Sequence, residues 1–480
     1  MQNILNLQPR AVIGFFSEIS AIPRGSGNEK AVADYLESFA HKRGLSFYRD
    51  ELENVMIRKS AQGCRADAPC IALQGHTDMV CEKDMVTTHD FSNDPIELIA
   101  EDGFLHANAT TLGADDGIAV AIMLALLDDK GLRHPPLECI FTSQEEIGLL
   151  GAGAFDGSQI TAKGMINIDS EEEGVATVSC CGGARMHLAK PLTYERTAKN
   201  AFEITVTGLA GGHSGMDIGK GRVSALKLLG QVLTALGKDL PFSLISIDGG
   251  GKDNAIARES RGVIAADTTL ARVTELVDVI HQALARTLTP DDQGFSVAIA
   301  PAAADTVLTK ACAADILTFI NVSPHGVLTR FAHSHEHVES SINFASMTTD
   351  AGELSCVFSA RSADDEQRGS IVKQLREAAS PLGFSMAVSG DYPGWAYAEK
   401  SWMRDLFAES YRELFGKELR FDVIHAGLEC GLFKAKCPEL DIIAIGATII
   451  DCHTPRERMS LVSCERIWEL LVDVLGRLCA

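Results

Sequence analysis

Apolar residues in the first part of the chain come in short runs that predict buried strands and helices in alternation. Residues 71–74, Ile-Ala-Leu-Gln, predict a strand that Gly75 ends. Residues 118–127 are all apolar and rich in Ala, Leu and Met, which predicts a buried helix rather than a strand. The other elements predicted before residue 190 are two helices within 8–42 and strands at 45–48, 54–58, 137–141 and 164–168. This alternation predicts an α/β fold with an open sheet.

From about residue 202 the order of the predicted elements changes. Strand, helix, strand, strand, helix and strand follow in an order that resembles a split β-α-β-β-α-β unit, at 202–208, 221–236, 241–248, 262–268, 272–287 and 294–300. A weaker echo of this order follows, with helices at 308–320 and 366–380 and strands at 340–347, 353–360 and 383–389. We therefore expect residues 191–391 to form an inserted domain, and residues 1–190 and 392–480 to form the two parts of the first domain.

The composition narrows the classes of function. The 480 residues are 46% hydrophobic and 22% charged, which suits a globular protein of two or three domains. The formal net charge of −22 argues against nucleic acid or an anionic membrane as partner. We find neither an apolar run of membrane-spanning length nor a signal peptide at the N-terminus. The thirteen cysteines lie mostly in apolar segments, which indicates reduced, buried thiols in a cytoplasm rather than a disulfide framework.

Several acidic and histidine side chains lie at the ends of predicted strands or at the start of a helix that follows one. Open α/β sheets build their sites at this edge. The set consists of His76, Asp78, Asp115, Glu145, Glu146, Asp169 and His453. Two imidazoles and several carboxylates suit divalent metals such as Zn²⁺, Mn²⁺ or Co²⁺. Without a metal these carboxylates would repel one another strongly, so either a metal is present or the groups lie apart.

Each member of this set also has an ordinary structural explanation. A His-X-Asp pattern is often a hydrogen-bonded turn, and aspartates such as Asp115 and Asp116 can cap the helix that follows them. Adjacent glutamates such as Glu145 and Glu146 are usually solvated surface residues. The residue types at these positions therefore leave both explanations open.

One further histidine group lies apart from these motifs. His333, His335 and His337 alternate along a polar stretch and would share one face of an extended strand. Because no buried carboxylate partner is evident beside them, we interpret them as exposed loop residues rather than as a metal site.

The ordered set of motifs resembles a known family over nearly the whole chain. The chain resembles the dinuclear zinc peptidases of the aminoacylase and carboxypeptidase type, and among them the bacterial aminoacyl-histidine dipeptidases, also called cytosol non-specific dipeptidases or peptidase D. The matching stretches are Gln-Gly-His-Thr-Asp-Met-Val at 74–80, Thr-Leu-Gly-Ala-Asp-Asp-Gly at 111–117, Glu-Glu-Ile-Gly-Leu at 145–149, Gly-Gly-His-Ser-Gly at 211–215, Asn-Ala-Ile-Ala-Arg-Glu at 254–259, His-Ala-Gly-Leu-Glu-Cys-Gly at 425–431, and His453. As an ordered set these motifs are far more specific than any one of them.

The resemblance implies a fold and a metal site. The fold would be a catalytic α/β/α sandwich with a mixed central sheet, interrupted by an inserted α+β lid and dimerisation domain with ferredoxin-like units. One metal would be held by Asp115, Glu146 and His453. The other would be held by His76, Asp169 and the shared Asp115. The peptide bond after Asp115 would be cis, as it often is in this family.

The resemblance also implies the roles of the remaining residues. Asp78 would orient His76, and Glu145 would be the general base. In the lid, His213 would stabilise the oxyanion, while Asn254 and Arg361 would bind the substrate, Arg361 through its C-terminal carboxylate. The residues alone leave open that the turn carrying His213 is only a turn and that Arg361 is a surface ion pair. On charge alone, Glu429 is a candidate to meet the free amine of a substrate.

Together these features predict a metal-dependent peptidase. Two metals roughly 3.5–4 Å apart can hold a bridging hydroxide and polarise a peptide carbonyl, with Glu145 taking the proton. The resemblance implies hydrolysis of dipeptides with free termini, including Xaa-His dipeptides such as carnosine. It implies two divalent ions per chain, zinc first, with cobalt or manganese as alternatives. An aminotripeptidase, a carboxypeptidase or an N-acyl amino-acid deacylase on the same scaffold is the alternative activity, and a non-catalytic binding protein the alternative class.

The expected partners are small dipeptides, with neither nucleic acid nor membrane among them. The resemblance implies a cytoplasmic homodimer. The preferred dipeptide, the physiological metal, and whether His213 serves its own or a partner's active site do not follow from the residues.

Overall fold

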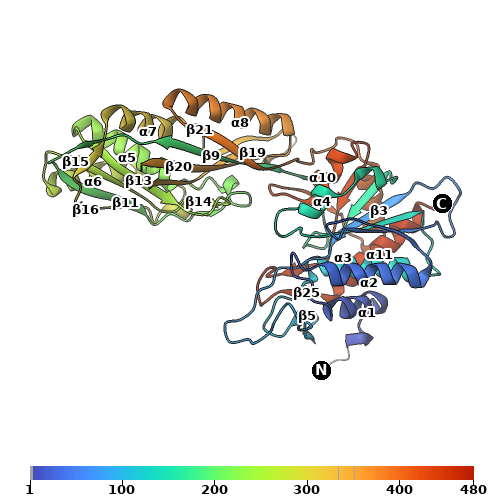
Figure 1. Cartoon of the computed structure of the whole chain (residues 1–480). Helices are drawn as coiled ribbons and strands as arrows, with labels where there is room; N and C mark the ends of the chain where they lie inside the picture. The colour runs from blue at the N-terminus through green and yellow to red at the C-terminus, as the bar shows by residue number, and fades with distance from the viewer. Residues whose placement is uncertain (1–3, 333, 351, 480) are drawn as a thin grey trace. The chain divides into compact units, whose positions relative to one another are not determined.

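The computed structural model of the protein describes residues 4–332, 334–350 and 352–479, which form two compact units (Figure 1). Unit 1 consists of the chain up to Cys180, of Tyr397–Val423 and of the chain from Leu428 onward. Unit 2 consists of Cys181–Ala396 and Ile424–Gly427. The second unit is therefore inserted into the first, and the chain enters it once more, briefly, at a place where the sequence analysis expects only the first domain.

Unit 1 is built on a mixed sheet of eight strands. In the centre, β6, β3, β7 and β23 are parallel neighbours. At the sides, β1 is antiparallel to β2, β2 to β6, and β8 to β23. All residues of β3 and β6 are buried, as expected for central strands covered on both faces. The strands lie in the order β1 (Ser46–Arg49), β2 (Val55–Lys59), β6 (Leu137–Thr142), β3 (Ile71–His76), β7 (Gly164–Asn167), β23 (Asp441–Ala444), β8 (Val175–Cys180) and β22 (Arg420–Ile424).

Helices pack against this sheet around one hydrophobic core. The predicted apolar helix is α3, which begins at Ala114 and lies against β3 and α1, with nearly every residue buried. A helix with apolar residues on every face is suited to a fully buried position. A small sheet of β24 (Ile449–Ile450), β25 (Arg458–Ser460), β5 (Phe104–Ala107) and β4 (Leu98–Glu101) completes the unit. Its helices are α1 (Arg10–Ser20), α2 (Lys30–Arg43), α3 (Ala114–Asp128), α4 (Leu150–Ala154), α9 (Trp402–Phe415), α10 (Glu429–Lys436) and α11 (Leu461–Arg477).

Unit 2 is built on one antiparallel sheet that its helices cover. The strand order is β16 (Ser296–Ala302), β11 (Asn200–Thr207), β15 (Ser260–Ala266), β13 (Ser243–Gly250), β19 (Ser334–Asp350), β20 (Glu353–Ser362), β9 (Gly182–Pro191) and β21 (Ser385–Tyr392), and β18 (Gly326–Phe331) pairs with β19. The helices are α5 (Ala225–Asp239), α6 (Leu270–Ala285), α7 (Lys310–Val322) and α8 (Asp365–Ala379). Apolar residues of helices and strands form a second core, separate from that of unit 1.

This sheet consists of two ferredoxin-like units joined edge to edge. The first is β11-α5-β13-β15-α6-β16, which confirms the predicted split β-α-β-β-α-β order. The second is β9-α7-β19-β20-α8-β21, with the same strand order in space. The two meet where β13 pairs with β19, at Gly249 opposite Met347. Strand β9 begins the second ferredoxin-like unit but precedes the whole first one in the chain. It therefore belongs to unit 2, whereas residues 182–190 were expected in the first domain.

The histidine group and the cysteines also differ from expectation. His335 and His337 lie in strand β19 rather than in a loop, and His333 lies outside the described residues. A disulfide joins Cys64 to Cys479, 415 positions apart, so these two are not the free thiols expected of them. Within the described residues, the other eleven cysteines form no disulfide. Among the helices of the described residues, none is long and apolar enough to cross a lipid bilayer.

Candidate active site

Three parallel strands of unit 1 end side by side, and the side chains singled out in the sequence follow them. Strand β3 ends at His76 itself, and β7 ends two residues before Asp169. Strand β6 ends at Thr142, just before Glu145 and Glu146. Because β6, β3 and β7 are parallel, these side chains emerge at the same edge of the sheet.

Asp115 lies between two histidines. Its Oδ1 is 3.1 Å from His76 Nε2, and its Oδ2 is 3.0 Å from His453 Nε2. His453 Nε2 is also 2.9 Å from Glu146 Oε1, and His76 Nε2 is 3.6 Å from Asp169 Oδ1. The structure therefore brings all five expected ligand residues close to one another. Asp115, Glu146 and His453 form one group that could hold a metal ion, as the resemblance implies, whereas the group around His76 and Asp169 includes Asp116.

The donor atoms of these groups fit divalent metal ions. Imidazole nitrogen and carboxylate oxygen are the ligands that zinc and its neighbours take in proteins. Glu146 Oε1 is buried and accepts no hydrogen bond of acceptable geometry, although it lies 2.9 Å from His453 Nε2. A buried carboxylate oxygen that accepts no hydrogen bond costs free energy, which a cation among these ligands would recover.

The carboxylates change the proton affinity of both histidines. The close carboxylates of Asp115 and Glu146 raise the pKa of His453 to about 11. Burial lowers the pKa of His76, but attraction to Asp169 and Asp115 outweighs this and raises it well above the ordinary value. Burial and the neighbouring charges of Asp115 and Glu146 raise the pKa of Asp169 to about 6. At neutral pH protons thus occupy the nitrogens that metal ions would use, so metal binding must displace them.

The Asp78 carboxylate is hydrogen-bonded to the backbone of Glu145, the general-base candidate, and lies farther from the ring of His76. Its carboxylate accepts hydrogen bonds from the backbone N–H of Glu145 at 3.0 Å and of Glu146 at 3.3 Å, and from the Ser26 hydroxyl at 2.7 Å. His76 Nδ1 lies 3.1 Å from the backbone carbonyl of Asp78 and 3.4 Å from the carboxylate. The expected contact between the two side chains exists, but the acceptor of the hydrogen bond from His76 Nδ1–H is the backbone carbonyl of Asp78.

Glu145 is a half-buried carboxylate beside the ligand groups. Within the described part of the chain, neither of its carboxylate oxygens accepts a hydrogen bond. Burial and the negative charges of Asp169, Glu429 and Glu146 raise its pKa well above the ordinary value, against the attraction of His76. A carboxylate in this setting takes up a proton more readily than an exposed glutamate does.

The two aspartates at the start of α3 do not act as ordinary helix caps. The peptide bond between Asp115 and Asp116 is cis, and both residues have non-helical backbone angles. Asp116 is buried, and its Oδ2 accepts a hydrogen bond from the backbone N–H of His76 at 3.2 Å. The capping explanation is therefore wrong here, because one carboxylate faces the histidines and the other supports the strand that carries His76.

Glu429 does not lie in an open turn. It is the first residue of α10 and is fully buried, and its Oε2 accepts hydrogen bonds from Gln74 Nε2 at 2.5 Å and from the Thr142 hydroxyl at 2.6 Å. Burial raises its pKa to about 7. Its carboxylate supports the ends of β3 and β6 from within, which does not favour contact with a substrate amine.

In unit 2, His213 has a defined tautomer. It lies in β12 (Gly212–His213), which pairs with β14 (Ala255–Ile256). Its Nδ1 accepts hydrogen bonds from the backbone N–H of Gly215 at 3.2 Å and of Met216 at 3.1 Å, so the ring proton lies on Nε2. Burial and the charge of Arg361 lower the pKa of His213. The imidazole is therefore a neutral hydrogen-bond donor at neutral pH.

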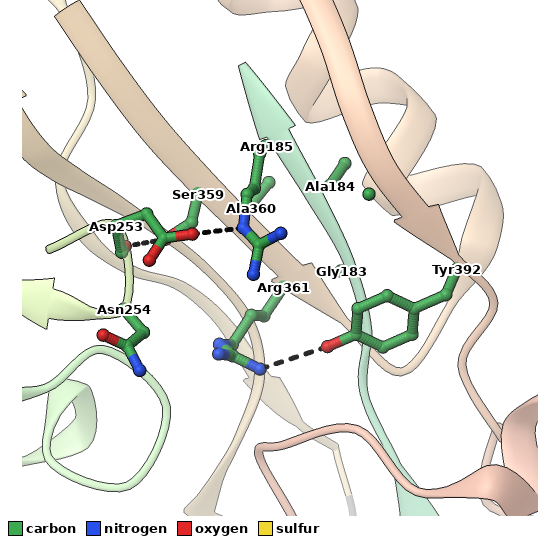
Figure 2. A pocket seen from close by; sticks show the side chains of 10 residues that line it. Gly183, Ala184, Arg185, Asp253, Asn254, Ser359, Ala360, Arg361 and Tyr392 are labelled. Atoms are coloured by element: carbon green, nitrogen blue, oxygen red, sulfur yellow. Dashed lines mark hydrogen bonds and ion pairs between the residues drawn. The ribbon is translucent and has the colours of Figure 1, made fainter. Parts of the chain in front are cut away.

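Arg361 and Asn254 line one pocket of unit 2 (Figure 2). Arg361 Nη1 donates to the Tyr392 hydroxyl at 3.3 Å, and Arg361 Nε is buried without a hydrogen-bond partner. Figure 2 shows the other arginine of the pocket, Arg185, paired with Asp253. Among the described residues, no carboxylate lies within ion-pair distance of Arg361, which argues against the surface ion pair that the sequence left open.

Comparison with known proteins places this chain in a family. The model of peptidase family M20/M25/M40 matches residues 72–477, which is most of the chain. The chain belongs to this family. It is therefore a peptide hydrolase, and the family resemblance seen in its motifs is confirmed.

Two similar proteins cover this M20 peptidase almost completely. The cytosol non-specific dipeptidase of Escherichia coli is 35% identical over 486 residues, 99% of each chain. The crystal structure of aminoacylhistidine dipeptidase from Vibrio alginolyticus superposes with a TM-score of 0.94 at 32% identity, over 99% of this chain and 98% of the other. Aminopeptidase PepT from Bacillus cereus, at 16% identity and a TM-score of 0.59, shares the fold, with 99% of this chain and all of the other covered.

Sequence reasoning missed three residues that contact the predicted ones. Tyr392 binds Arg361, while Arg24 and Glu457 bind the backbone around Asp115. Nothing in the sequence near Arg24 or Glu457 connects them to Asp115. The only sequence feature related to these contacts is the pair of glycines in Gly-Ala-Asp-Asp-Gly, and the folded chain shows why glycine is needed there.

Proposed function

We propose that this M20 peptidase hydrolyses the peptide bond of dipeptides with free amino and carboxyl termini, Xaa-His dipeptides such as carnosine included. The single observation that carries the chemistry is Asp115, whose two carboxylate oxygens face His76 and His453. The substrate class is supported by full-length similarity to proteins described as a non-specific dipeptidase and an aminoacylhistidine dipeptidase.

Two divalent cations would bind this site. His76, Asp115 and Asp169 would hold one, and Asp115, Glu146 and His453 the other. We propose zinc, with cobalt and manganese as alternatives, because imidazole and carboxylate ligands suit all three. When bound, the cations would lower the pKa of a water molecule and polarise the carbonyl of the scissile peptide bond.

Glu145 is the proposed general base. Its carboxylate would accept a proton from the attacking water and pass it to the nitrogen of the leaving amine. The hydrogen bond from the Glu145 backbone N–H to Asp78 Oδ1 supports this role, since it fixes the backbone on which the carboxylate stands. The side chain itself stays free to exchange the proton.

The residues of unit 2 fit substrate binding. His213 would donate its Nε2–H to the oxygen of the scissile carbonyl as negative charge develops there. Arg361 and Asn254 would bind the substrate, Arg361 through its C-terminal carboxylate, and the Tyr392 hydroxyl would hold the Arg361 guanidinium in place. Because Arg185 is paired with Asp253, Arg361 is the arginine of this pocket that can meet an anionic group, with the amide of Asn254 in the same lining.

A panel of substrates tests this proposal. The purified protein is stripped of metal and assayed with Ala-His, β-Ala-His, Leu-Gly, a tripeptide and an N-acetyl amino acid, before and after return of Zn²⁺, Co²⁺ or Mn²⁺. Metal-dependent cleavage confined to the dipeptides is the expected result. Release of an amino acid from the tripeptide or the acyl substrate would keep the metal site and overturn the substrate class, and inactivity with every metal would favour a binding protein.

A cytoplasmic homodimer is part of the same proposal. The relative described as a cytosol dipeptidase supports the location, and the family resemblance supports the dimer. Sedimentation of the purified protein tests the oligomeric state directly: a single species of about twice the 51.5 kDa chain mass is expected.

A further inference from the structure

One buried carboxylate binds four consecutive backbone amides next to the metal-ligand candidates. Glu457 is only 2% exposed. Its Oε2 accepts hydrogen bonds from the N–H groups of Leu112 at 2.8 Å and Gly113 at 3.0 Å. Its Oε1 accepts from Ala114 at 2.8 Å and Asp115 at 3.3 Å. A carboxylate has about four acceptor positions, so the whole capacity of Glu457 is spent on fixing the backbone that ends at Asp115.

A buried arginine binds the carbonyl groups of the same loop. Arg24, also 2% exposed, donates from Nη2 to the Gly113 carbonyl at 2.5 Å. Its Nη1 donates to the carbonyls of Thr77 at 3.0 Å and Asp78 at 3.3 Å. Arg24 therefore joins the loop before Asp115 to the segment after His76, and its positive charge attracts Glu457.

The glycines of the Gly-Ala-Asp-Asp-Gly motif make room for this arginine. A Cβ atom at Gly113 would lie 2.6 Å from Arg24 Nη2, and one at Gly117 would lie 2.5 Å from the same atom. Gly113 also has a φ of +69°, which side chains rarely adopt. Both glycines of the motif are thus explained by the approach of Arg24, a residue far away in the sequence.

The same contacts connect the segments that carry the ligands. Glu457 follows His453 in one short segment, so its bonds tie the His453 segment to the Asp115 loop. Arg24 ties the His76 segment to that loop in the same way. We propose that Glu457 and Arg24 are positioning residues that set the spacing of Asp115 from both histidines, and so the affinity of the site for its two metal ions. This inference rests on the metal-dependent function proposed above.

Replacing Glu457 by glutamine tests the inference with little change of shape. Glutamine offers one carbonyl oxygen and turns the other oxygen into an NH₂ group, which opposes backbone N–H groups and breaks part of the contact. Loss of a residue that orients metal ligands typically weakens metal binding about 10- to 100-fold. We therefore expect Glu457→Gln to bind at least one of its two metal ions, tested as Co²⁺ or Zn²⁺, about 10- to 100-fold more weakly than the wild type. The measurement is competition with a chromophoric chelator, together with the visible spectrum of bound Co²⁺, which reports ligand geometry.

Glu138 supplies a matched control. It is also 2% exposed and accepts hydrogen bonds from the backbone N–H groups of Thr161 and Ala162, with Arg58 nearby, but it lies at the opposite end of strand β6 from Glu145. Glu138→Gln should lower thermal stability and leave Co²⁺ affinity and spectrum unchanged. A purely structural role for Glu457 would make the two variants alike, with lower stability and unchanged metal binding, and this result would overturn the inference.

Arg24→Lys covers the case in which Glu457→Gln does not fold. Lysine keeps the charge, but its single ammonium cannot span both backbone segments as the guanidinium does. Weaker Co²⁺ binding or a changed Co²⁺ spectrum in this variant supports the inference, and wild-type values for both overturn it. Wild-type protein that binds no metal at all would instead contradict the proposed function itself, which separates the two failures.

Discussion

The pKa values of the histidines are shifted in opposite directions in the two units. In unit 1, carboxylates raise the pKa of His76 well above its ordinary value and that of His453 to about 11. In unit 2, burial and the charge of Arg361 lower the pKa of His425 to about 3, and burial also lowers that of His213. The histidines of unit 1 therefore lie among carboxylates that can also bind cations, whereas the histidines of unit 2 stay neutral.

This difference suits the two units to different parts of the proposed reaction. Unit 1 gathers buried carboxylates whose negative charge is balanced by protons on the histidines or by metal ions, as in groups of metal ligands. Unit 2 presents an arginine without a carboxylate partner among the described residues, together with a neutral histidine, which suits an anionic group and a developing oxyanion. The experiments below change one side of this division at a time.

The largest effect is expected from Glu145→Gln in unit 1. Glutamine cannot accept the proton of the attacking water, so kcat should fall about 10²- to 10⁴-fold. The number of metal ions bound per chain should stay that of the wild type, because Glu145 is not among the proposed ligands. Turnover and metal content are measured on the same preparation. Glu146→Gln is the paired control and should lose metal as well as turnover, whereas near-normal kcat in Glu145→Gln would remove Glu145 from the mechanism.

A smaller effect is expected from Arg361→Lys in unit 2. Charge-assisted hydrogen bonds contribute about 1.5–3 kcal/mol, so KM for dipeptides with a free carboxylate should rise about tenfold to a hundredfold. Metal affinity should not change, because no proposed ligand lies in this unit. KM is compared for dipeptides and their C-terminal amides, which lack the anionic group.

Arg185→Lys is the control for this variant, because Arg185 lines the same pocket but is already paired with Asp253. We expect a clearly smaller change in KM. If Arg361→Lys raised KM equally for dipeptides and their amides, Arg361 would not be binding the carboxylate.

The smallest perturbation is a change of pH on the metal-free protein. The folded pKa of His453, about 11, lies above the unfolded value near 6.5, so its contribution to stability is complete below pH 6.5 and is lost as pH rises towards 11. The folded pKa of His425, about 3, lies below 6.5, so its contribution is complete above pH 6.5 and is lost as pH falls towards 3. The units should therefore lose these contributions at opposite ends of the pH range.

Nuclear magnetic resonance of the histidine rings measures this contrast directly. His453→Asn and His425→Asn assign the two ring signals in the metal-free protein. We expect one signal to titrate far above pH 6.5 and the other far below it. If both titrated near 6.5, the contrast between the units would not exist.

Much of the site could be predicted from the sequence because its residues belong to local sequence patterns. Strands β3, β6 and β7 were predicted from short apolar runs, and His76, Glu145, Glu146 and Asp169 follow the ends of those runs. The rule that parallel strands present their carboxyl ends at one edge then predicts the gathering that the structure shows. The ordered motifs added the family, which the comparisons confirm.

What the sequence by itself determined is therefore local: the strands, the order of the motifs and the residue types at the strand ends. Only the tertiary structure decided that β9 completes the second ferredoxin-like unit of the inserted sheet, that Asp78 binds the backbone of Glu145, and that Glu457 fixes the loop of Asp115. The physical reason is the same for all three. Periodicity reports which face of an element is buried, but a backbone hydrogen bond has no sequence signature at its partner, and that partner can stand hundreds of residues away.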